Sequence, residues 1–96
     1  MSSTPEAKVK AAIRKILDTT QTYYAMPIGT GFGNSGVPDF LICSKGRFIG
    51  VEAKAGKGKT TALQDMNLAK IVASGGVSLV VNETNLDELK DLLCSK

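Results

Sequence analysis

The 96-residue chain contains no histidine. This absence excludes the commonest general base, the Ser-His-Asp and Cys-His nucleophile systems, and any zinc site built on histidine. Catalysis by this chain would therefore have to rely on carboxylates, lysine, tyrosine, backbone groups or a bound metal ion.

Cysteine and long apolar runs are also scarce. Cys43 and Cys94 lie far apart without a C-x-x-C motif, so we expect two reduced thiols and no metal site built on them. No run approaches the roughly 18 apolar residues of a membrane span, and the N-terminus lacks the charged-then-apolar pattern of an export signal. We therefore expect a cytoplasmic protein with no membrane partner.

The composition is that of a soluble globular protein, with 43% hydrophobic and 22% charged residues. A chain of this length predicts one domain, residues 1–96, whose modest core would benefit from self-association. The net charge of +3 and the pI near 9.0 are compatible with a polyanionic partner such as nucleic acid, but they do not prove one.

The most informative stretch is residues 36–54, which predicts a β-hairpin. Two apolar runs flank Lys45-Gly46, where glycine supplies the positive φ of a tight turn. A loop of two or four residues centred there fixes one register for the two strands. The resulting cross-strand pairs are Phe40 with Val51, Ile42 with Ile49, and Asp39 with Glu52.

This register places the carboxylates of Asp39 and Glu52 opposite each other, and alternation puts Lys54 on the same face as Glu52. Like charges that face each other destabilise a sheet, so a cation belongs between them, and a divalent metal ion is the natural candidate. The alternative is that Asp39 is a turn residue after Pro38, while Glu52 is an exposed strand residue paired with Lys54.

A first helix is predicted over residues 5–18, with Thr4 as N-cap, Pro5 at the first position and Glu6 in the first turn. Glu6 lies on the buried side of this helix. It either stabilises the helix dipole or reaches toward the hairpin carboxylates. The apolar stripe consists of Val9, Ala12, Ile13, Ile16 and Leu17.

A first strand is predicted over residues 22–26 and ends at Pro27. The glycine-rich residues 29–36 contain the Gly-x-Gly-x-x-Gly pattern of dinucleotide-binding sites. That pattern has to open a helix, and here it precedes a predicted strand, so we reject the match. We expect a loop there, which is either a plain connection or a cover that lets a phosphate backbone approach the site.

A second glycine-rich stretch follows Lys54. Its Gly58-Lys59-Thr60 is not a P-loop, because Ala53 occupies the position of the first required glycine. Lys57 and Lys59 either contact nucleic-acid phosphates nonspecifically or belong to a solvated turn.

A second helix is predicted over residues 61–74, with Gly75-Gly76 as its stop. Thr61 and Gln64 form a capping box, so Gln64 either only caps the helix or also belongs to the site. The inner face is marked by Leu68, Ile71 and Val72.

Residues 77–81 predict a buried strand, parallel to an earlier one because a helix connects them. Asn85 begins a capping sequence for a final helix with four leucines, Leu86, Leu89, Leu92 and Leu93. The expected class is therefore α/β, with the order αβββαβα around a small mixed sheet with flanking helices.

The motif residues resemble the VRR-NUC family of PD-(D/E)xK nucleases. An early helical glutamate, Gly-x-Pro-Asp, Glu-x-Lys and a glutamine on the next helix follow one another in the family's order. These elements are Glu6, Gly36-Val37-Pro38-Asp39, Glu52-Ala53-Lys54 and Gln64. Family members often carry a basic residue just before Gly-x-Pro-Asp, where this chain has Asn34-Ser35.

The resemblance implies a restriction-endonuclease-like core and a Mg²⁺-dependent or Mn²⁺-dependent endonuclease that hydrolyses DNA. Asp39, Glu52 and the backbone carbonyl of Ala53 would hold the metal, and Glu6 would serve a second one. Lys54 would orient the attacking water, with Gln64 positioning Lys54 or that water. It also implies a homodimer that acts on branched DNA such as four-way Holliday junctions.

Two alternatives remain at this point. One is a noncatalytic DNA-binding module of the same fold, which would be expected to have lost an acid or the lysine. The other is a structure-tolerant or restriction-type nuclease, and a fixed recognition sequence would demand reading loops for which 96 residues leave little room.

Overall fold

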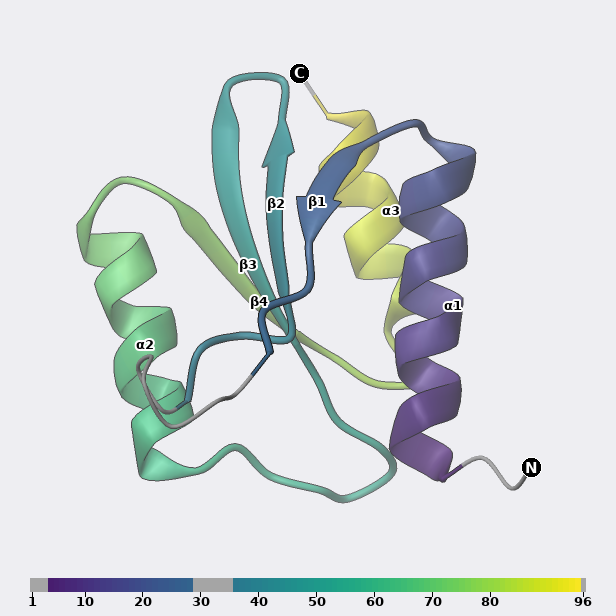
Figure 1. Ribbon diagram of the computed structural model, residues 1–96, viewed down its shortest axis with the longest axis vertical. Helices are drawn as coiled ribbons and strands as arrows, with labels where there is room; N and C mark the ends of the chain where they lie inside the picture. The colour runs from purple at the N-terminus through teal and green to yellow at the C-terminus, as the bar shows by residue number, and fades with distance from the viewer. Residues whose placement is uncertain (1–3, 29–35, 96) are drawn as a thin grey trace.

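A computed structural model describes residues 4–28 and 36–95 of the chain. The elements follow the expected αβββαβα order (Figure 1). They are α1 (Pro5–Thr19), β1 (Tyr23–Ala25), β2 (Phe40–Ser44), β3 (Arg47–Ala53), α2 (Ala62–Ala73), β4 (Val77–Val81) and α3 (Leu86–Cys94).

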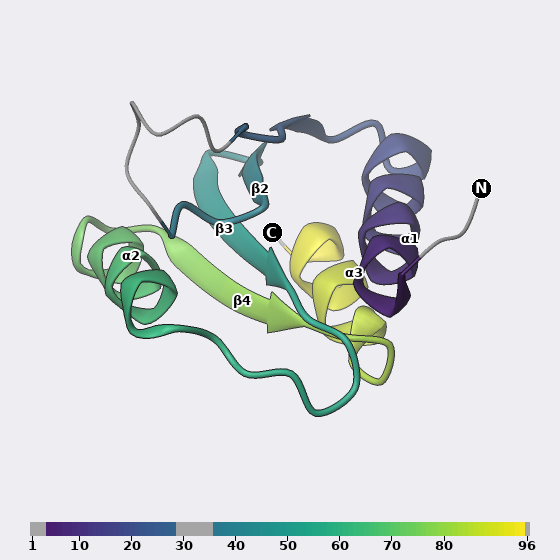
Figure 2. The ribbon, with the colours of Figure 1, turned by 60° about the horizontal axis from the view of Figure 1, so that its bottom comes forward.

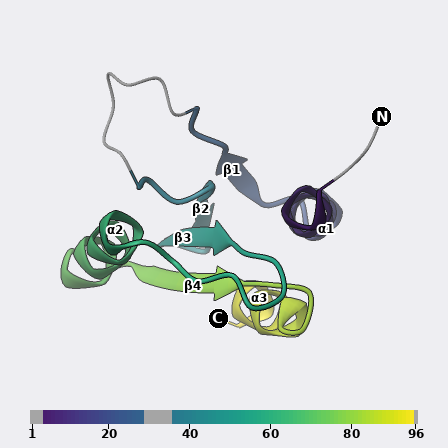
Figure 3. The ribbon, with the colours of Figure 1, turned by 90° about the horizontal axis from the view of Figure 1, so that it is seen from below.

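The four strands form one mixed sheet in the order β1-β2-β3-β4. The β1–β2 and β2–β3 pairs are antiparallel, whereas β3 and β4 are parallel. Seen from below, α2 lies on one side of the strands, and α1 and α3 lie on the other (Figure 3). The small α/β class with a mixed sheet and flanking helices is thus confirmed.

The β2–β3 hairpin has the predicted two-residue turn. Lys45 and Gly46 both take positive φ values, 53° and 82°, which is the pattern of a type I′ turn. Ser44 therefore pairs with Arg47. The predicted pairs of Phe40 with Val51 and of Ile42 with Ile49 are confirmed.

The main core lies between the sheet and the α1–α3 pair. The predicted stripe of α1 supplies three buried side chains, and the inner faces of the strands and of α3 supply the rest. These residues are Val9, Ile13, Leu17, Phe40, Ile42, Ile49, Val51, Ala53, Val81, Leu89 and Leu93. Burying this apolar surface is the chief source of the domain's stability.

The other face of the sheet is packed more tightly against backbone. A Cβ on Gly50 would lie 2.5 Å from Cδ1 of Ile71 and 3.3 Å from Cγ of Pro38, and one on Gly36 would lie 2.7 Å from the Leu63 carbonyl. Glycine at these two positions lets the chain before β2 pass between β3 and α2. This passage places Asp39, the next residue after Pro38, at the start of β2.

Three sequence expectations are wrong in detail. The predicted strand over residues 22–26 is shorter, because only Tyr23–Ala25 pair with β2. Val72 does not lie on the inner face of α2 and is 55% exposed. Asn85 takes the N-cap position of α3 without capping it, because its side chain instead accepts a hydrogen bond from the Asn82 N–H and donates one to the Val80 carbonyl.

The strand at residues 77–81 is confirmed as parallel to β3, but it is not a buried central strand. It forms one edge of the sheet. Val80 is 39% exposed, and only Val81 is fully buried. Because β4 has a neighbouring strand on one side only, its apolar surface is incompletely covered and part of it faces solvent.

The glycine-rich segment expected to form a loop falls within residues 29–36, and all of it except Gly36 lies outside the described residues. Within the described ranges, no helix is both long and apolar enough to cross a membrane. Both cysteines are exposed thiols that form no disulfide.

Candidate active site

Asp39 lies one residue before β2 and is held by the hairpin that follows it. Its Oδ2 accepts a hydrogen bond of 2.9 Å from the backbone N–H of Ala53 on β3. The pairing of β2 with β3 ends with Phe40 opposite Val51. Asp39 and Glu52 are the next residues beyond that pair, and their side chains interact. The contact with Ala53 fixes one carboxylate oxygen and leaves Oδ1 directed elsewhere.

Glu52 is the one buried acidic residue among those described, with only 3% of its surface exposed. It belongs to β3, where Ile49 to Ala53 are buried at five consecutive positions because helices cover both faces. The alternative that Glu52 is an exposed strand residue is therefore wrong. A carboxylate in such a place needs partners, because burying an unpaired charge is costly.

The pKa of the Glu52 carboxyl is raised from 4.5 to about 7, and burial is the largest cause. The charge of Asp39 and a hydrogen bond from protonated Glu52 to Asp39 contribute to this rise, whereas the Lys54 ammonium lowers the pKa. Glu6 contributes the smallest rise. Near neutral pH, this carboxyl is therefore poised between its neutral and ionised forms.

Two donors hold one oxygen of Glu52. Its Oε2 accepts a 3.0 Å hydrogen bond from Nε2 of Gln64, and Nζ of Lys54 lies 3.7 Å from the same oxygen. The lysine side chain is only 14% exposed. The other oxygen, Oε1, is buried, and in the ionised carboxylate it has no hydrogen-bond partner within residues 4–28 and 36–95.

Gln64 caps α2 and also contacts Glu52. Its Oε1 accepts from the Thr61 N–H at 2.9 Å, and its backbone N–H donates to Oγ1 of Thr61 at 3.2 Å. The capping box is thus complete. Because the cap uses Oε1, the amide nitrogen is oriented toward Glu52, so the start of α2 positions a donor at the carboxylate.

Glu6 does not join the other two carboxylates directly. Its Oε2 lies 3.8 Å from Nζ of Lys10 on the next turn of α1, and that ammonium lies 3.4 Å from Oδ1 of Asp39. The described residues include no group of three His, Cys, Asp or Glu side chains that could hold a metal ion. The second metal that Glu6 would serve stays a prediction.

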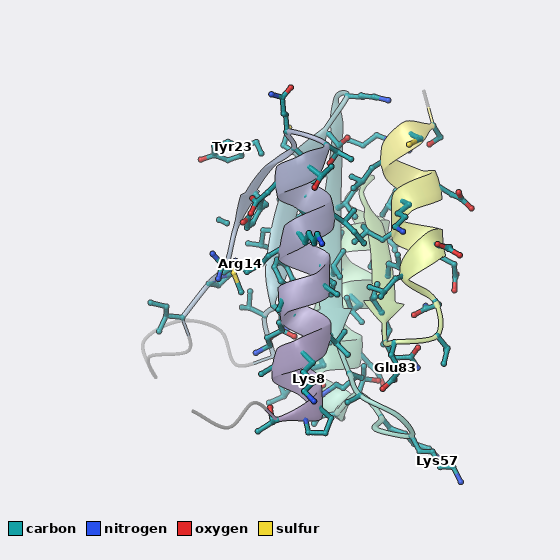
Figure 4. All side chains as sticks on the ribbon, turned by 90° about the vertical axis from the view of Figure 1, so that its right-hand side faces the viewer. Lys8, Arg14, Tyr23, Lys57 and Glu83 are labelled. Atoms are coloured by element: carbon teal, nitrogen blue, oxygen red, sulfur yellow. The ribbon has the colours of Figure 1, made fainter. Side chains whose placement is uncertain are left out.

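Lys57 and Lys59 lie in the connection between β3 and α2, which runs along the end of the sheet (Figure 2). Both are exposed, and Lys57 extends away from the rest of the domain (Figure 4). The connection is tied to the loop after β4 by a 2.7 Å hydrogen bond from the Gly56 N–H to Oε1 of Glu83. The two lysines are thus accessible to solvent, as both the predicted phosphate contact and the alternative of a solvated turn require.

The donor set fits one hard divalent cation. Oε1 of Glu52 is a buried oxygen without a hydrogen-bond partner in the described chain, and Oδ1 of Asp39 lies 3.4 Å from Nζ of Lys10. The N–H and C=O of one strand residue point toward the same neighbour, so the Ala53 carbonyl points toward the Asp39 side. Carboxylate and carbonyl oxygens with added water are the ligands that Mg²⁺ and Mn²⁺ prefer.

Lys10 is the site residue that the sequence analysis missed. A signal was available, because Glu6 and Lys10 are spaced four apart on a helix and such pairs lie side by side. The contact of Lys10 with Asp39 could not be predicted from the sequence, because it joins residues 29 positions apart on separate elements. Only the packing of α1 beside the start of β2 produces it.

The chain matches no protein-family model and none of the curated proteins with which it was compared. Its resemblance to the VRR-NUC nucleases therefore rests on the motif residues and on their convergence around Glu52.

Proposed function

We propose that this protein is a metal-dependent endodeoxyribonuclease of the PD-(D/E)xK type, similar to the VRR-NUC nucleases. The observation that carries the proposal is the environment of Glu52. An acidic side chain only 3% exposed, with one oxygen held by Gln64 and Lys54 and the other without a partner, is unfavourable for a purely structural role. Such an arrangement is typical of functional sites.

Asp39, Glu52 and the Ala53 carbonyl are the groups that would hold Mg²⁺ or Mn²⁺. When bound, such a cation lowers the pKa of coordinated water and neutralises charge on phosphate oxygens. Asp39 is oriented for this role by the Ala53 N–H. Gln64 holds Oε2 of Glu52, which leaves Oε1 available.

Lys54 supplies the fixed positive charge of the site. Its ammonium is largely buried beside Glu52, so its charge acts in an environment where charge is weakly screened. This position suits it to orient the attacking water and to stabilise the negative charge that develops during phosphodiester hydrolysis. The absence of histidine leaves these groups as the means of acid–base and electrostatic catalysis.

The proposed substrate is branched DNA, such as a four-way Holliday junction, and the proposed assembly is a homodimer. Resolving a four-way junction requires paired cuts on two strands, and a domain with one site needs a two-fold partner to make both. Light scattering at the working concentration should give the mass of a dimer. A strict monomer that cuts every branched and linear DNA equally would favour a structure-tolerant nuclease instead.

The direct test is a cleavage assay with linear, flapped and four-way DNA, in Mg²⁺, in Mn²⁺ and in chelator. Replacing Glu52→Gln, Asp39→Asn or Lys54→Met should each lower kcat/KM by at least about a hundredfold, because each removes a group that interacts with the transition state. DNA binding should change by only a few-fold. Lys70→Met is the matched control, because Lys70 is an exposed lysine of α2 away from the carboxylates.

Three outcomes would contradict the proposal. These are cleavage in chelator, full activity in the Glu52→Gln protein, and an equal loss in the Lys70→Met control. Tight DNA binding by the parent without cleavage in either metal would favour the noncatalytic module.

A further inference from the structure

Lys10 connects α1 to the candidate active site. Its ammonium lies between two carboxylates, 3.4 Å from Oδ1 of Asp39 and 3.8 Å from Oε2 of Glu6. The side chain is 35% exposed, in contrast to 14% for Lys54. Lys10 thus contacts the site from its solvent side, whereas Lys54 is enclosed within it.

The four carboxylate oxygens of the pair differ in what they contact. Oδ2 of Asp39 accepts from the Ala53 N–H, and Oε2 of Glu52 is held by Gln64 and Lys54. Oε1 of Glu52 has no partner in the described ranges, and Oδ1 of Asp39 faces the Lys10 ammonium. A cation that binds between the two residues would therefore share an oxygen with Lys10.

We propose that Lys10 is a displaceable internal cation that neutralises Asp39 while the site is empty and moves to a DNA phosphate when a divalent cation binds. This inference rests on the proposed function. Two cations at Oδ1 of Asp39 repel each other. The Lys10 ammonium is the one that moves, because it is partly exposed and its flexible side chain lets it stay hydrated as it leaves the carboxylate. The displaced ammonium remains at the mouth of the site, where a phosphate backbone would lie.

The exchange has two thermodynamic consequences. Without DNA, Lys10 competes with the metal, so its removal should tighten metal binding. With DNA, the metal releases Lys10 for a phosphate contact, so metal and DNA should each strengthen binding of the other through this residue, as linkage requires. A lysine that contributes only general positive charge would affect DNA binding equally with and without metal, and its removal would tighten metal binding no more than the removal of another lysine nearby.

The first experiment measures Mn²⁺ binding to the DNA-free protein by calorimetry at pH 8. The variants are Lys10→Gln, Lys10→Arg and Lys8→Gln. Lys8 is the matched control because it is an exposed lysine of the same helix and lies on the side that faces away from the sheet (Figure 4). We expect Lys10→Gln to bind Mn²⁺ about three- to tenfold more tightly than the parent. The other two variants should stay within about twofold.

Equal or weaker Mn²⁺ binding by Lys10→Gln would overturn the inference, and so would an equal gain in Lys8→Gln. Failure of the proposed function looks different, because in that case the parent itself would not bind Mn²⁺, or Glu52→Gln would bind it as well as the parent does. Melting curves in chelator would verify that every variant is folded.

The second experiment measures binding of a short four-way DNA by fluorescence anisotropy, in Ca²⁺ and in chelator. We expect Lys10→Gln to weaken binding about three- to tenfold in Ca²⁺ and less than twofold in chelator. Lys8→Gln should have the same effect in both buffers. An equal loss for Lys10→Gln in both buffers would overturn the inference, because Lys10 would then contact DNA independently of metal.

Discussion

The two faces of the sheet differ in what they bury. The face covered by α1 and α3 holds the apolar core, whose buried side chains are at most 4% exposed. The face covered by α2 contains Glu52, and Leu68 is the buried hydrophobic residue that α2 supplies. Three further large apolar residues of α2, Leu63, Met66 and Val72, are about half exposed.

This difference indicates a division of labour within a small domain. Burial of apolar surface on the first face stabilises the fold and offsets the free-energy cost of burying an acid on the second face. The strand between them, β3, is the element that both faces share, since its alternate residues point to opposite sides. The comparison therefore predicts that substitutions on the two faces will differ in size and in pH dependence.

The largest expected effect on stability is on the α1–α3 face. Ile13→Ala removes a fully buried side chain and should reduce the free energy of unfolding by about 2–5 kcal/mol. Val72→Ala on α2 should change it by less than about 0.5 kcal/mol. Urea denaturation measures both. If Ile13→Ala prevents folding, Ile13→Val should still cost about 0.5–1.5 kcal/mol, and equal effects on the two faces would refute the comparison.

The next effect depends on pH and involves Glu52. Its pKa rises from 4.5 in the unfolded chain to about 7 in the folded one. The unfolded chain therefore loses this proton first as pH rises, so stability falls between about pH 4.5 and 7 and levels off above. At about 1.4 kcal/mol per pKa unit, the loss is on the order of 3 kcal/mol.

Glu52→Gln should remove this loss. The variant should unfold at a higher temperature than the parent at pH 8, and its advantage should vanish below about pH 3.5, where the parent carboxyl is protonated in both states. Melting curves across this pH range test the prediction. An advantage that does not vary with pH would mean that the buried charge is not its cause.

Asp39→Asn should have a smaller effect of the same origin. It keeps an oxygen for the Ala53 N–H but removes the charge that opposes Glu52. In chelator at pH 8, we expect a melting temperature a few degrees higher, because about 0.5–1 kcal/mol of repulsion is relieved. The further rise that Mg²⁺ or Mn²⁺ gives the parent should shrink. Equal metal-induced shifts in both proteins would exclude Asp39 as a ligand.

The last prediction separates the cap of α2 from the site, and its distinguishing signal is a small shift in a pH profile. Thr61→Ala removes the hydroxyl that accepts from the Gln64 N–H and should cost about 1 kcal/mol, with Thr61→Ser as the control that keeps the cap. Gln64→Ala should also remove the donor to Glu52 and so raise the pKa of that carboxyl further. The pH at which stability falls should shift upward only in Gln64→Ala, and identical pH profiles for both variants would leave Gln64 as a cap alone.

Much of the local structure was predictable because its causes are local. Thr4 and Thr61 cap their helices as expected, and Lys45-Gly46 determines the hairpin register through its backbone angles. The register alone brings Asp39 and Glu52 together. The candidate site residues Lys54 and Gln64 were found through motif spacing, and the contacts that join them to Glu52 are seen only in the structure.

The failed expectations concern what lies against each element. Val72 belongs to an apolar stripe in sequence, yet α2 covers too little of the sheet to bury it. The strand at residues 77–81 is apolar enough for a central position, but no strand follows it in the sheet order. Periodicity states which residues share a face, and it cannot state whether anything packs against that face.

The amino-acid sequence by itself determined the order of elements, the caps, the tight turn and the opposition of two acids across a hairpin, because each depends on neighbours within one or two elements. Only the tertiary structure decided that Glu52 is buried, that one of its oxygens lacks a partner, and that Lys10 contacts Asp39. The physical reason is that desolvation and charge pairing depend on every element that packs around a residue, and α1, α2 and β3 meet here only after the chain has folded.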